Sequence, residues 1–304
     1  MAESSPVKKI AILGANGYIG RNMSFYLHQF GYSVQDFDIQ DQTDNAWMQY
    51  EKLDIREQKS LSKISADCNF IFLFSGITGT WNGFDNYQSF IEINEIGLLN
   101  VLNFMRLSDS KARIIFPSTR LVYKGIENTA LAEDAKKEPR TIYAINKLAG
   151  EQLLQLYADI FNIKYTIYRL SVPYGNLVGK NYSYGTIGFF LKQATEKQEI
   201  TLYGDGSLRR TFSNIEDICR LLCVSMNNPA SVNETFNIGG ENFSLREVAA
   251  LISSHYKKSA IIYIPWEENS LKIESGDTVF DSAKIDSLCN FEYKNTFIKW
   301  LDKL

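Results

Sequence analysis

Apolar runs alternate with segments of helical periodicity along the first 170 residues of this 304-residue chain. Runs rich in β-branched and aromatic residues predict strands at residues 8–13, 33–37, 48–53, 69–74, 113–116 and 164–170. Helical patterns follow the first run up to about residue 30 and recur at residues 57–64, 85–107 and 141–162. This regular alternation predicts an α/β protein built on a doubly wound parallel sheet.

The alternation loosens beyond residue 172. A polar, glycine-containing stretch at residues 176–185 is expected to be a loop, and helical patterns follow at residues 186–196, 216–226, 245–256 and 295–302. A strand that ends in a glycine turn is expected at residues 200–207, and strands at residues 235–238 and 260–264. We interpret this half as a smaller substrate-binding lobe that is interleaved with the last elements of the sheet.

Composition and charge exclude several classes of protein. The formal net charge is −3 and no run of lysine or arginine exceeds a pair, which argues against a nucleic-acid partner. The four cysteines form no CxxC motif and there are two histidines, so a metal site is not expected. Residues 1–9 lack the apolar core of a signal peptide, and the apolar run at residues 70–74 is too short to span a bilayer. We therefore expect a cytoplasmic protein with reduced thiols and no membrane partner.

A glycine motif, Gly14-x-x-Gly17-x-x-Gly20, lies between the first strand and the first helix. Glycines in that context permit a tight turn and close approach of a pyrophosphate, and the helix N-terminus adds N–H groups and a positive dipole. The motif predicts a dinucleotide-binding Rossmann-type domain over residues 1–172, with returning segments near 210–240, and leaves residues 173–304 mainly to the lobe. The predicted cradle comprises Gly14, Asn16, Gly17, Tyr18, Ile19 and Gly20.

The second predicted strand leads to Asp38, eighteen residues beyond Gly20. A carboxylate at this place can accept hydrogen bonds from the adenosine ribose and repels a 2′-phosphate, so it favours NAD over NADP. Asp36 is the competing candidate, because alternation along the strand turns both side chains to the same face. Asp38 is preferred for its position at the strand end.

Other polar or glycine residues also follow the strands directly. They are Asp54, the turn Ser75-Gly76-Ile77-Thr78-Gly79, and Ser118 with Thr119. Ligands of doubly wound sheets bind at the carboxyl ends of the strands. We therefore expect these positions, together with Gly14 and Asp38, to surround a bound cofactor.

A tyrosine and a lysine, Tyr143 and Lys147, stand four residues apart at the start of the helix predicted at residues 141–162. Residues so spaced share a helix face, so the ammonium can lower a phenol pKa that is normally near ~10. Of the seventeen tyrosines, Tyr143 alone has a lysine four positions further on. Such a tyrosine can exchange a proton with a substrate hydroxyl.

Together these motifs resemble the extended short-chain dehydrogenase/reductases, and within them the NAD-dependent epimerase/dehydratase family that acts on nucleotide sugars. The resemblance runs from about Lys8 to the C-terminal helix. Four motifs carry it: Gly14-x-x-Gly17-x-x-Gly20, Ser118-Thr119-x-x-Val122-Tyr123, Tyr143-x-x-x-Lys147, and Tyr203-Gly204-Asp205-Gly206-Ser207 followed by Arg210.

The resemblance implies a role for each matching residue. Thr119 matches the residue that hydrogen-bonds the reacting sugar hydroxyl, Tyr143 the acid/base, and Lys147 the residue that holds the nicotinamide ribose. Asp38 matches the ribose-binding acid, and Arg210 an arginine that binds the nucleotide diphosphate. The implied cofactor-binding residues also include Asp54, Ile55, Phe74, Ser75, Gly76, Asn94, Ser118, Tyr143 and Lys147, and the implied substrate-binding residues are Thr119, Tyr143, Tyr203 and Arg210.

Some positions depart from the family's patterns. The catalytic threonine position is followed by Arg120-Leu121, where 4,6-dehydratases have Asp-Glu and UDP-glucuronate decarboxylases Ser-Glu. Neither subclass is expected, because both need that extra carboxylate for proton transfer. Glu274 stands where a second phosphate-binding arginine is common, and Lys272 or Lys180 is a candidate replacement.

The resemblance leaves three functions open. The first is a nucleotide-sugar epimerase, expected at C4, which retains its NAD and therefore fits Asp38. The second is an NAD(P)H-dependent 4-keto-6-deoxy nucleotide-sugar reductase, which suits the modest length and Val172, a valine where many members have a substrate-binding asparagine. The third is a non-catalytic dinucleotide-sensing regulator, although all three catalytic positions are retained. The resemblance also implies a homodimer through the helices near residues 85–107 and 141–162.

Overall fold

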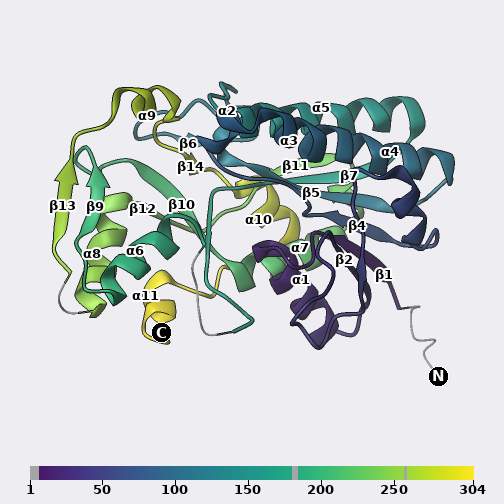
Figure 1. Cartoon of the computed structure of the whole chain (residues 1–304), viewed down its shortest axis with the longest axis horizontal. Helices are drawn as coiled ribbons and strands as arrows, with labels where there is room; N and C mark the ends of the chain where they lie inside the picture. The colour runs from purple at the N-terminus through teal and green to yellow at the C-terminus, as the bar shows by residue number, and fades with distance from the viewer. Residues whose placement is uncertain (1–6, 180–183, 257–258) are drawn as a thin grey trace. The chain divides into compact units, whose positions relative to one another are not determined.

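The computed structural model (Figure 1) describes residues 7–179, 184–256 and 259–304. Its main sheet has seven strands in the order β11-β7-β5-β4-β1-β2-β3. They are β1 (Lys9–Leu13), β2 (Ser33–Asp38), β3 (Tyr50–Lys52), β4 (Phe70–Leu73), β5 (Arg113–Thr119), β7 (Lys164–Leu170) and β11 (Glu234–Asn237). From β1 the chain winds outward through β2 and β3 on one side and through β4 and β5 on the other, always with parallel pairing. The predicted doubly wound parallel sheet is thus confirmed.

Helices cover both faces of this sheet and bury its apolar residues. α3 (Tyr87–Ile91), α4 (Gly97–Leu107) and α5 (Ile142–Phe161) lie on one face, and α1 (Tyr18–Gln29) lies on the other (Figure 1). A Cβ added at Gly150 would lie 2.8 Å from Cζ of Phe116, so this glycine lets α5 approach the sheet closely. The close approach brings Lys147, one turn earlier on α5, over the same ring.

The helix expected at residues 85–107 is interrupted in the structure. A short helix, α2 (Asn82–Asp85), ends at Asn86, whose backbone is not helical, and α3 then continues through a π-helical turn, η2 (Glu92–Ile96), into α4. Apolar periodicity is the same on both sides of such a turn, so the pattern of residues does not reveal it. π-helical turns are frequent at functional sites, and this one carries Asn94.

The remaining elements are mostly short. The strands are β6 (Ala130–Leu131), β8 (Val172–Tyr174), β9 (Ile200–Tyr203), β10 (Arg209–Asn214), β12 (Glu241–Ser244), β13 (Ile261–Ile264) and β14 (Val279–Phe280). The α-helices are α6 (Gly185–Thr195), α7 (Ile215–Met226), α8 (Leu245–Tyr256), α9 (Glu268–Ile273), α10 (Ala283–Cys289) and α11 (Phe297–Leu301), and 3₁₀ helices lie at η1 (Gln58–Lys63), η3 (Arg120–Val122) and η4 (Pro229–Ser231). The helices predicted in this half coincide closely with α6, α7, α8 and α11. The strands β6, β8, β10, β12 and β14 and the helices α9 and α10 were not expected. Most of these elements are too short to show a clear periodicity.

The chain forms two compact units. Unit 1 comprises Met1–Ser118, Thr141–Tyr168 and Cys223–Thr235, and unit 2 comprises Thr119–Arg140, Arg169–Leu222 and Phe236–Leu304. Unit 1 contains most of the seven-stranded sheet. The three small sheets, ordered β12-β10-β8, β13-β9 and β14-β6, belong to unit 2, where α6 and α8 pack against β9. The domain limits expected from the sequence stay a prediction. Among the described residues, no helix combines the length and hydropathy that a membrane span requires.

Candidate active site

A cavity of about 320 Å³ opens in unit 1 beside the carboxyl ends of strands β1, β2, β3 and β4. It is lined by Gly14, Asn16, Gly17, Asp38, Ile39, Gln40, Leu53, Asp54, Ile55, Arg56, Phe74, Ser75, Gly76, Ile77 and Ile93. Four strand-end positions singled out in the sequence, Gly14, Asp38, Asp54 and Ser75, are therefore brought together as expected from the sheet topology.

The glycine turn after β1 forms one wall and has no room for side chains. Gly14 has a φ of +93°, and a Cβ there would lie 2.4 Å from the backbone N of Ser75. A Cβ at Gly20 would lie 2.0 Å from the carbonyl O of Gly14, whereas one at Gly17 would meet the same oxygen at 3.2 Å. Gly17 is the N-cap of α1 and provides no side-chain cap. An uncapped helix N-terminus behind a close-packed glycine turn suits the binding of a pyrophosphate.

Asp38 is fixed at the end of β2 by two backbone amides. Its Oδ2 accepts a hydrogen bond from the N–H of Asn16 at 3.0 Å, and its Oδ1 accepts one from the N–H of Ile39 at 2.8 Å. An ionised carboxylate has about four acceptor positions, so Asp38 keeps acceptor capacity on the cavity side. The competing candidate, Asp36, is fully buried beneath α1, where His28 Nε2 lies 3.1 Å from its Oδ2 and burial raises its pKa. Asp36 does not line the cavity.

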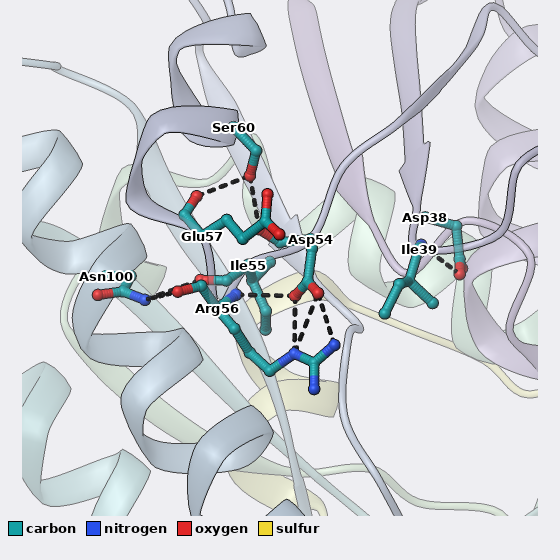
Figure 2. A network of polar contacts seen from close by, with 8 residues as sticks. All are labelled: Asp38, Ile39, Asp54, Ile55, Arg56, Glu57, Ser60 and Asn100. Carbon is teal, nitrogen blue, oxygen red and sulfur yellow. Dashed lines mark hydrogen bonds and ion pairs between the residues drawn. The ribbon is translucent and has the colours of Figure 1, made fainter.

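The loop after β3 is held by a dense set of polar contacts (Figure 2). The carboxylate of Asp54 accepts hydrogen bonds from Nε of Arg56 at 3.0 Å and from Nη2 of Arg56 at 2.6 Å. These hydrogen bonds lower the pKa of Asp54. Ser60 donates to the carbonyl of Asp54 at 2.5 Å, and the amide of Asn100, on α4, donates to the carbonyls of Ile55 and Arg56 at 3.0 and 2.9 Å. Several hydrogen bonds therefore hold this loop at the cavity, and Arg56 neutralises Asp54.

Arg56 is a cavity residue that sequence reasoning missed. The available signal was its place two residues after Asp54 at a strand end. Its backbone N–H also donates to Oδ1 of Asp54 at 2.9 Å, so the loop folds back on its own carboxylate.

Asn94 acts on the cavity through the neighbouring loop. Its Oδ1 accepts from the N–H of Ile77 at 2.9 Å, and its amide donates to the carbonyl of Ile77 at 3.0 Å and to Oδ1 of Asn146 at 3.4 Å. Asn94 itself does not line the cavity. It positions the loop after β4 instead, and its predicted contact with a cofactor stays a prediction.

Tyr143 and Lys147 lie on the first turns of α5, which begins where Thr141 Oγ1 accepts the N–H of Ala144 at 3.1 Å. Lys147 is 7% exposed, with Nζ 4.5 Å from the ring centre of Phe116 and 5.9 Å from that of Tyr143. Burial lowers the pKa of Lys147 to about 8, and the charge of Glu151 partly opposes this. The ammonium of Lys147 is therefore buried on the helix face that carries the ring of Tyr143.

The hydroxyl of Ser118 donates a hydrogen bond to Oε1 of Glu151. Ser118 is the last residue of the first segment of unit 1. Both side chains are buried, and Glu151 lies one turn beyond Lys147 on α5. Ser118 therefore helps to set the charge environment of Lys147. A direct contact between Ser118 and a cofactor stays a prediction.

Replacing Lys147 by methionine should raise the free energy of unfolding near pH 7 by about 3 kcal/mol, since each pKa unit corresponds to about 1.4 kcal/mol. Below pH 8 the lysine is charged in both states, so the penalty for burying the charge is fully present. Between about 8 and 10.5 the folded state loses its proton while the unfolded state keeps it, so the wild-type protein gains stability as pH rises. Urea unfolding of both proteins at pH 7 and pH 10 measures this. A difference that does not shrink at pH 10 would contradict it.

Three predicted site residues belong to unit 2. Thr119 is buried and its Oγ1 accepts the N–H of Leu121 at 3.3 Å. Tyr203 is 40% exposed and stacks on Trp266 with ring centres 5.0 Å apart. Arg210 is 2% exposed and forms an ion pair at 2.7 Å with Glu274, the residue that stands in place of a second arginine. Of the two lysines considered as replacements, Lys272 pairs with Glu268 at 2.6 Å and Lys180 lies outside the described residues.

Comparison with known proteins gives consistent results. Residues 10–239 match the model of the NAD dependent epimerase/dehydratase family. A Methanocaldococcus jannaschii protein named as a putative UDP-glucose 4-epimerase is 26% identical over 287 residues, which cover 92% of each chain.

Solved structures agree with this chain in fold. The UDP-glucose 4-epimerase of Thermus thermophilus, in complex with NAD, has a TM-score of 0.84 at 19% identity over 96% of each chain. A double mutant of the dTDP-glucose 4,6-dehydratase DesIV from Streptomyces venezuelae, with NAD bound, has the same TM-score and identity, over 96% of this chain and 94% of its own. Equal likeness to an epimerase and a dehydratase means that the fold does not select between their reactions.

Proposed function

We propose, starting from the fact that this chain belongs to the NAD dependent epimerase/dehydratase family, that it is an epimerase acting at C4 of a nucleotide-diphosphate hexose. The observation that carries the proposal is the buried Lys147 beside Tyr143 on α5. A regulator without catalysis has no need to keep a buried, destabilising charge next to a phenol. The name of the Methanocaldococcus jannaschii relative supports epimerisation among the reactions of the family.

The residues of the unit 1 cavity fit NAD. The glycine turn has no space for a Cβ at Gly14 or Gly20, which suits a pyrophosphate lying against the backbone. Asp38 offers acceptors to the ribose hydroxyls, and its charge disfavours the 2′-phosphate of NADP. When bound, NAD supplies the exchange of a hydride with the sugar carbon.

The chain's own residues then handle the proton. Tyr143 takes the proton of the reacting hydroxyl as tyrosinate and returns it as phenol. Lys147 stabilises the tyrosinate before the proton is taken and after it is returned, and Thr119 donates a hydrogen bond to the hydroxyl oxygen. Arg120 occupies the position at which a dehydratase has an acid, so the elimination of water lacks its proton donor. Interconversion of epimers needs no such donor, and this favours epimerisation over dehydration.

Turnover of a substrate panel tests the proposal. The purified protein is given UDP-, dTDP-, CDP- and GDP-hexoses, and the 4-keto-6-deoxy sugars of the same nucleotides, with NAD, NADP or NADH added in turn. We expect epimers to interconvert with NAD and without net loss of NADH, and NADP to support less activity. Stoichiometric oxidation of NADH by a keto sugar would show a reductase and contradict the epimerase proposal. The absence of any conversion or binding would contradict both the epimerase and the reductase assignments.

We also propose a homodimer through α4 and α5. Both helices expose large apolar side chains, namely Leu107 on α4 and Leu156, Ile160 and Phe161 on α5. An exposed apolar patch of this kind is typical of a protein–protein interface. Sedimentation velocity tests it, and a monomer at micromolar concentration would exclude it.

A further inference from the structure

Unit 2 contains two arginines that share one nearby carboxylate. Arg210 on β10 pairs with Oε1 of Glu274 at 2.7 Å. Arg120 on η3 donates from Nη1 to the hydroxyls of Ser275 and Thr278, at 3.1 and 3.2 Å. The charge of Arg210 acts on Arg120 and that of Glu274 acts on both. These side chains form what we call the arginine cluster: Arg120, Arg210, Glu274, Ser275 and Thr278.

Within the arginine cluster, Arg210 is the arginine whose guanidinium has a carboxylate partner. Besides its ion pair, its Nη1 donates to the carbonyls of Arg209 and Gly276 at 3.0 and 2.7 Å. Asp277 adds a second carboxylate whose charge acts on Arg210. The backbone is tied at the same place, since the N–H of Thr278 donates to the carbonyl of Arg209 at 3.0 Å. A ligand anion could reach Arg210 only by displacing these contacts, so Arg210 serves as a scaffold for the segment around residue 276.

Arg120 is the unsatisfied member. The only hydrogen-bond partners of its guanidinium in the described part of the chain are the neutral hydroxyls of Ser275 and Thr278, and no carboxylate there lies within ion-pair distance. Its Nε and Nη2 donate to none of the described residues. This edge of a guanidinium is the planar fork that binds a carboxylate or phosphate through two hydrogen bonds.

The electrostatic surroundings of Arg120 also favour the binding of an anion. Burial and the neighbouring charge of Arg210 lower the pKa of Arg120 to about 9, so the group stays charged at neutral pH. Glu274 acts on Arg120 only from beyond ion-pair distance, and a charge withdrawn from water without a directly paired counterion is destabilising. The residue as a whole is nevertheless only partly buried, in contrast to Arg210.

We propose that Arg120 binds an oxyanion of the substrate, with Arg210 and Glu274 holding the segment that orients it. The inference rests on the proposed function, because Arg120 directly follows Thr119, the residue proposed to contact the reacting hydroxyl. The hydroxyls of Ser275 and Thr278 orient Nη1, and the fork formed by Nε and Nη2 receives the oxyanion. The oxyanion is either the diphosphate of the nucleotide sugar or a carboxylate carried by the sugar.

Isothermal titration calorimetry tests this with UDP, UDP-glucose and UDP-glucuronate, and with the dTDP, CDP and GDP counterparts that are available. Arg120→Met should raise the Kd about 10- to 100-fold, the loss expected for hydrogen bonds between charged groups. Arg120→Lys keeps the charge without the fork and should lose less. Lys192→Met removes another cation of unit 2, an exposed lysine on α6 that is already paired with Glu196, and should bind as the wild type does.

The ligands distinguish the two oxyanions. A weakened affinity of Arg120→Met for UDP itself identifies the diphosphate, whereas an unchanged affinity for UDP with a selective loss for UDP-glucuronate identifies the sugar carboxylate. Equal Kd values for wild type, Arg120→Met and Arg120→Lys would overturn the inference and leave the epimerase proposal intact. A wild-type protein that binds NAD but none of the nucleotides would overturn the proposed function instead.

Discussion

Replacing Tyr143 by phenylalanine should lower kcat about 10²- to 10⁴-fold, the contribution typical of a positioned acid/base. The variant keeps the ring beside Lys147 and loses the hydroxyl that carries the proton, so folding and cofactor binding should be unchanged. The cavity that fits NAD does not include Tyr143 among its lining residues. Epimer interconversion followed by NMR, together with the NAD content of the purified protein, measures both expectations.

The matched control for this variant is Tyr157→Phe, on the same helix α5. Tyr157 packs against the ring of Phe161 with centres 5.2 Å apart, and no lysine follows it at the fourth position. Its activity should stay within about twofold of wild type, since Tyr157 has no part in the proposed proton transfer and the change keeps its ring in place. Full activity of Tyr143→Phe would contradict the proposal that Tyr143 transfers the proton.

Alanine at Gly20 should abolish the binding of NAD and destabilise the protein by about 1–3 kcal/mol or more. Its Cβ would lie 2.0 Å from the carbonyl O of Gly14 and 2.9 Å from the carbonyl carbon, and both are backbone atoms that cannot rotate away. The turn and α1 would have to separate, and this moves the uncapped helix N-terminus away from the position of the pyrophosphate. Dinucleotide content after purification and thermal unfolding measure the two effects.

Gly17→Ala is the control for Gly20→Ala, in the same motif. Its Cβ would meet the carbonyl O of Gly14 at 3.2 Å, a contact that a shift of a few tenths of an ångström relieves. We expect Gly17→Ala to fold normally and to weaken NAD binding far less than Gly20→Ala. Equal losses in the two variants would mean that the sensitivity of the motif does not come from the contact at Gly20.

Much of the fold could be predicted because it depends on periodicity. The strand predicted at residues 164–170 has the same limits as β7, and buried strands such as β4 show as apolar runs. The interruption of the long helix at Asn86 and the π-helical turn could not be predicted. The π-helical turn carries Asn94, whose side chain bonds the backbone of Ile77, seventeen residues earlier in the chain, and a sequence pattern does not show such a contact.

The candidate site was predictable to the extent that it follows the strand ends. Sheet topology alone brings Gly14, Asp38, Asp54 and Ser75 to one cavity. The sequence could not establish which side chains pair. Asp54 pairs with Arg56 only in particular side-chain rotamers, and the order of residues does not determine these.

The same limit applies to the pairing of Arg210 with Glu274, which depends on the packing of a segment more than sixty residues away. Choosing between Asp36 and Asp38 also needed the fold. Both face the same side of β2, but α1 covers Asp36 and leaves Asp38 at the open end of the strand.

The chain crosses between the two units five times, so segments of the two units are translated alternately. Unit 1 is closed by residues 223–235, which contribute to β11, the strand that pairs with β7 at the edge of the main sheet. Until those residues emerge, β7 presents an open edge, and open edges invite pairing with other chains. A long segment of unit 2, residues 169–222, is translated during that interval. The nascent dinucleotide-binding sheet therefore stays incomplete and exposed for that time, and this interval is when a chaperone would be most useful to it.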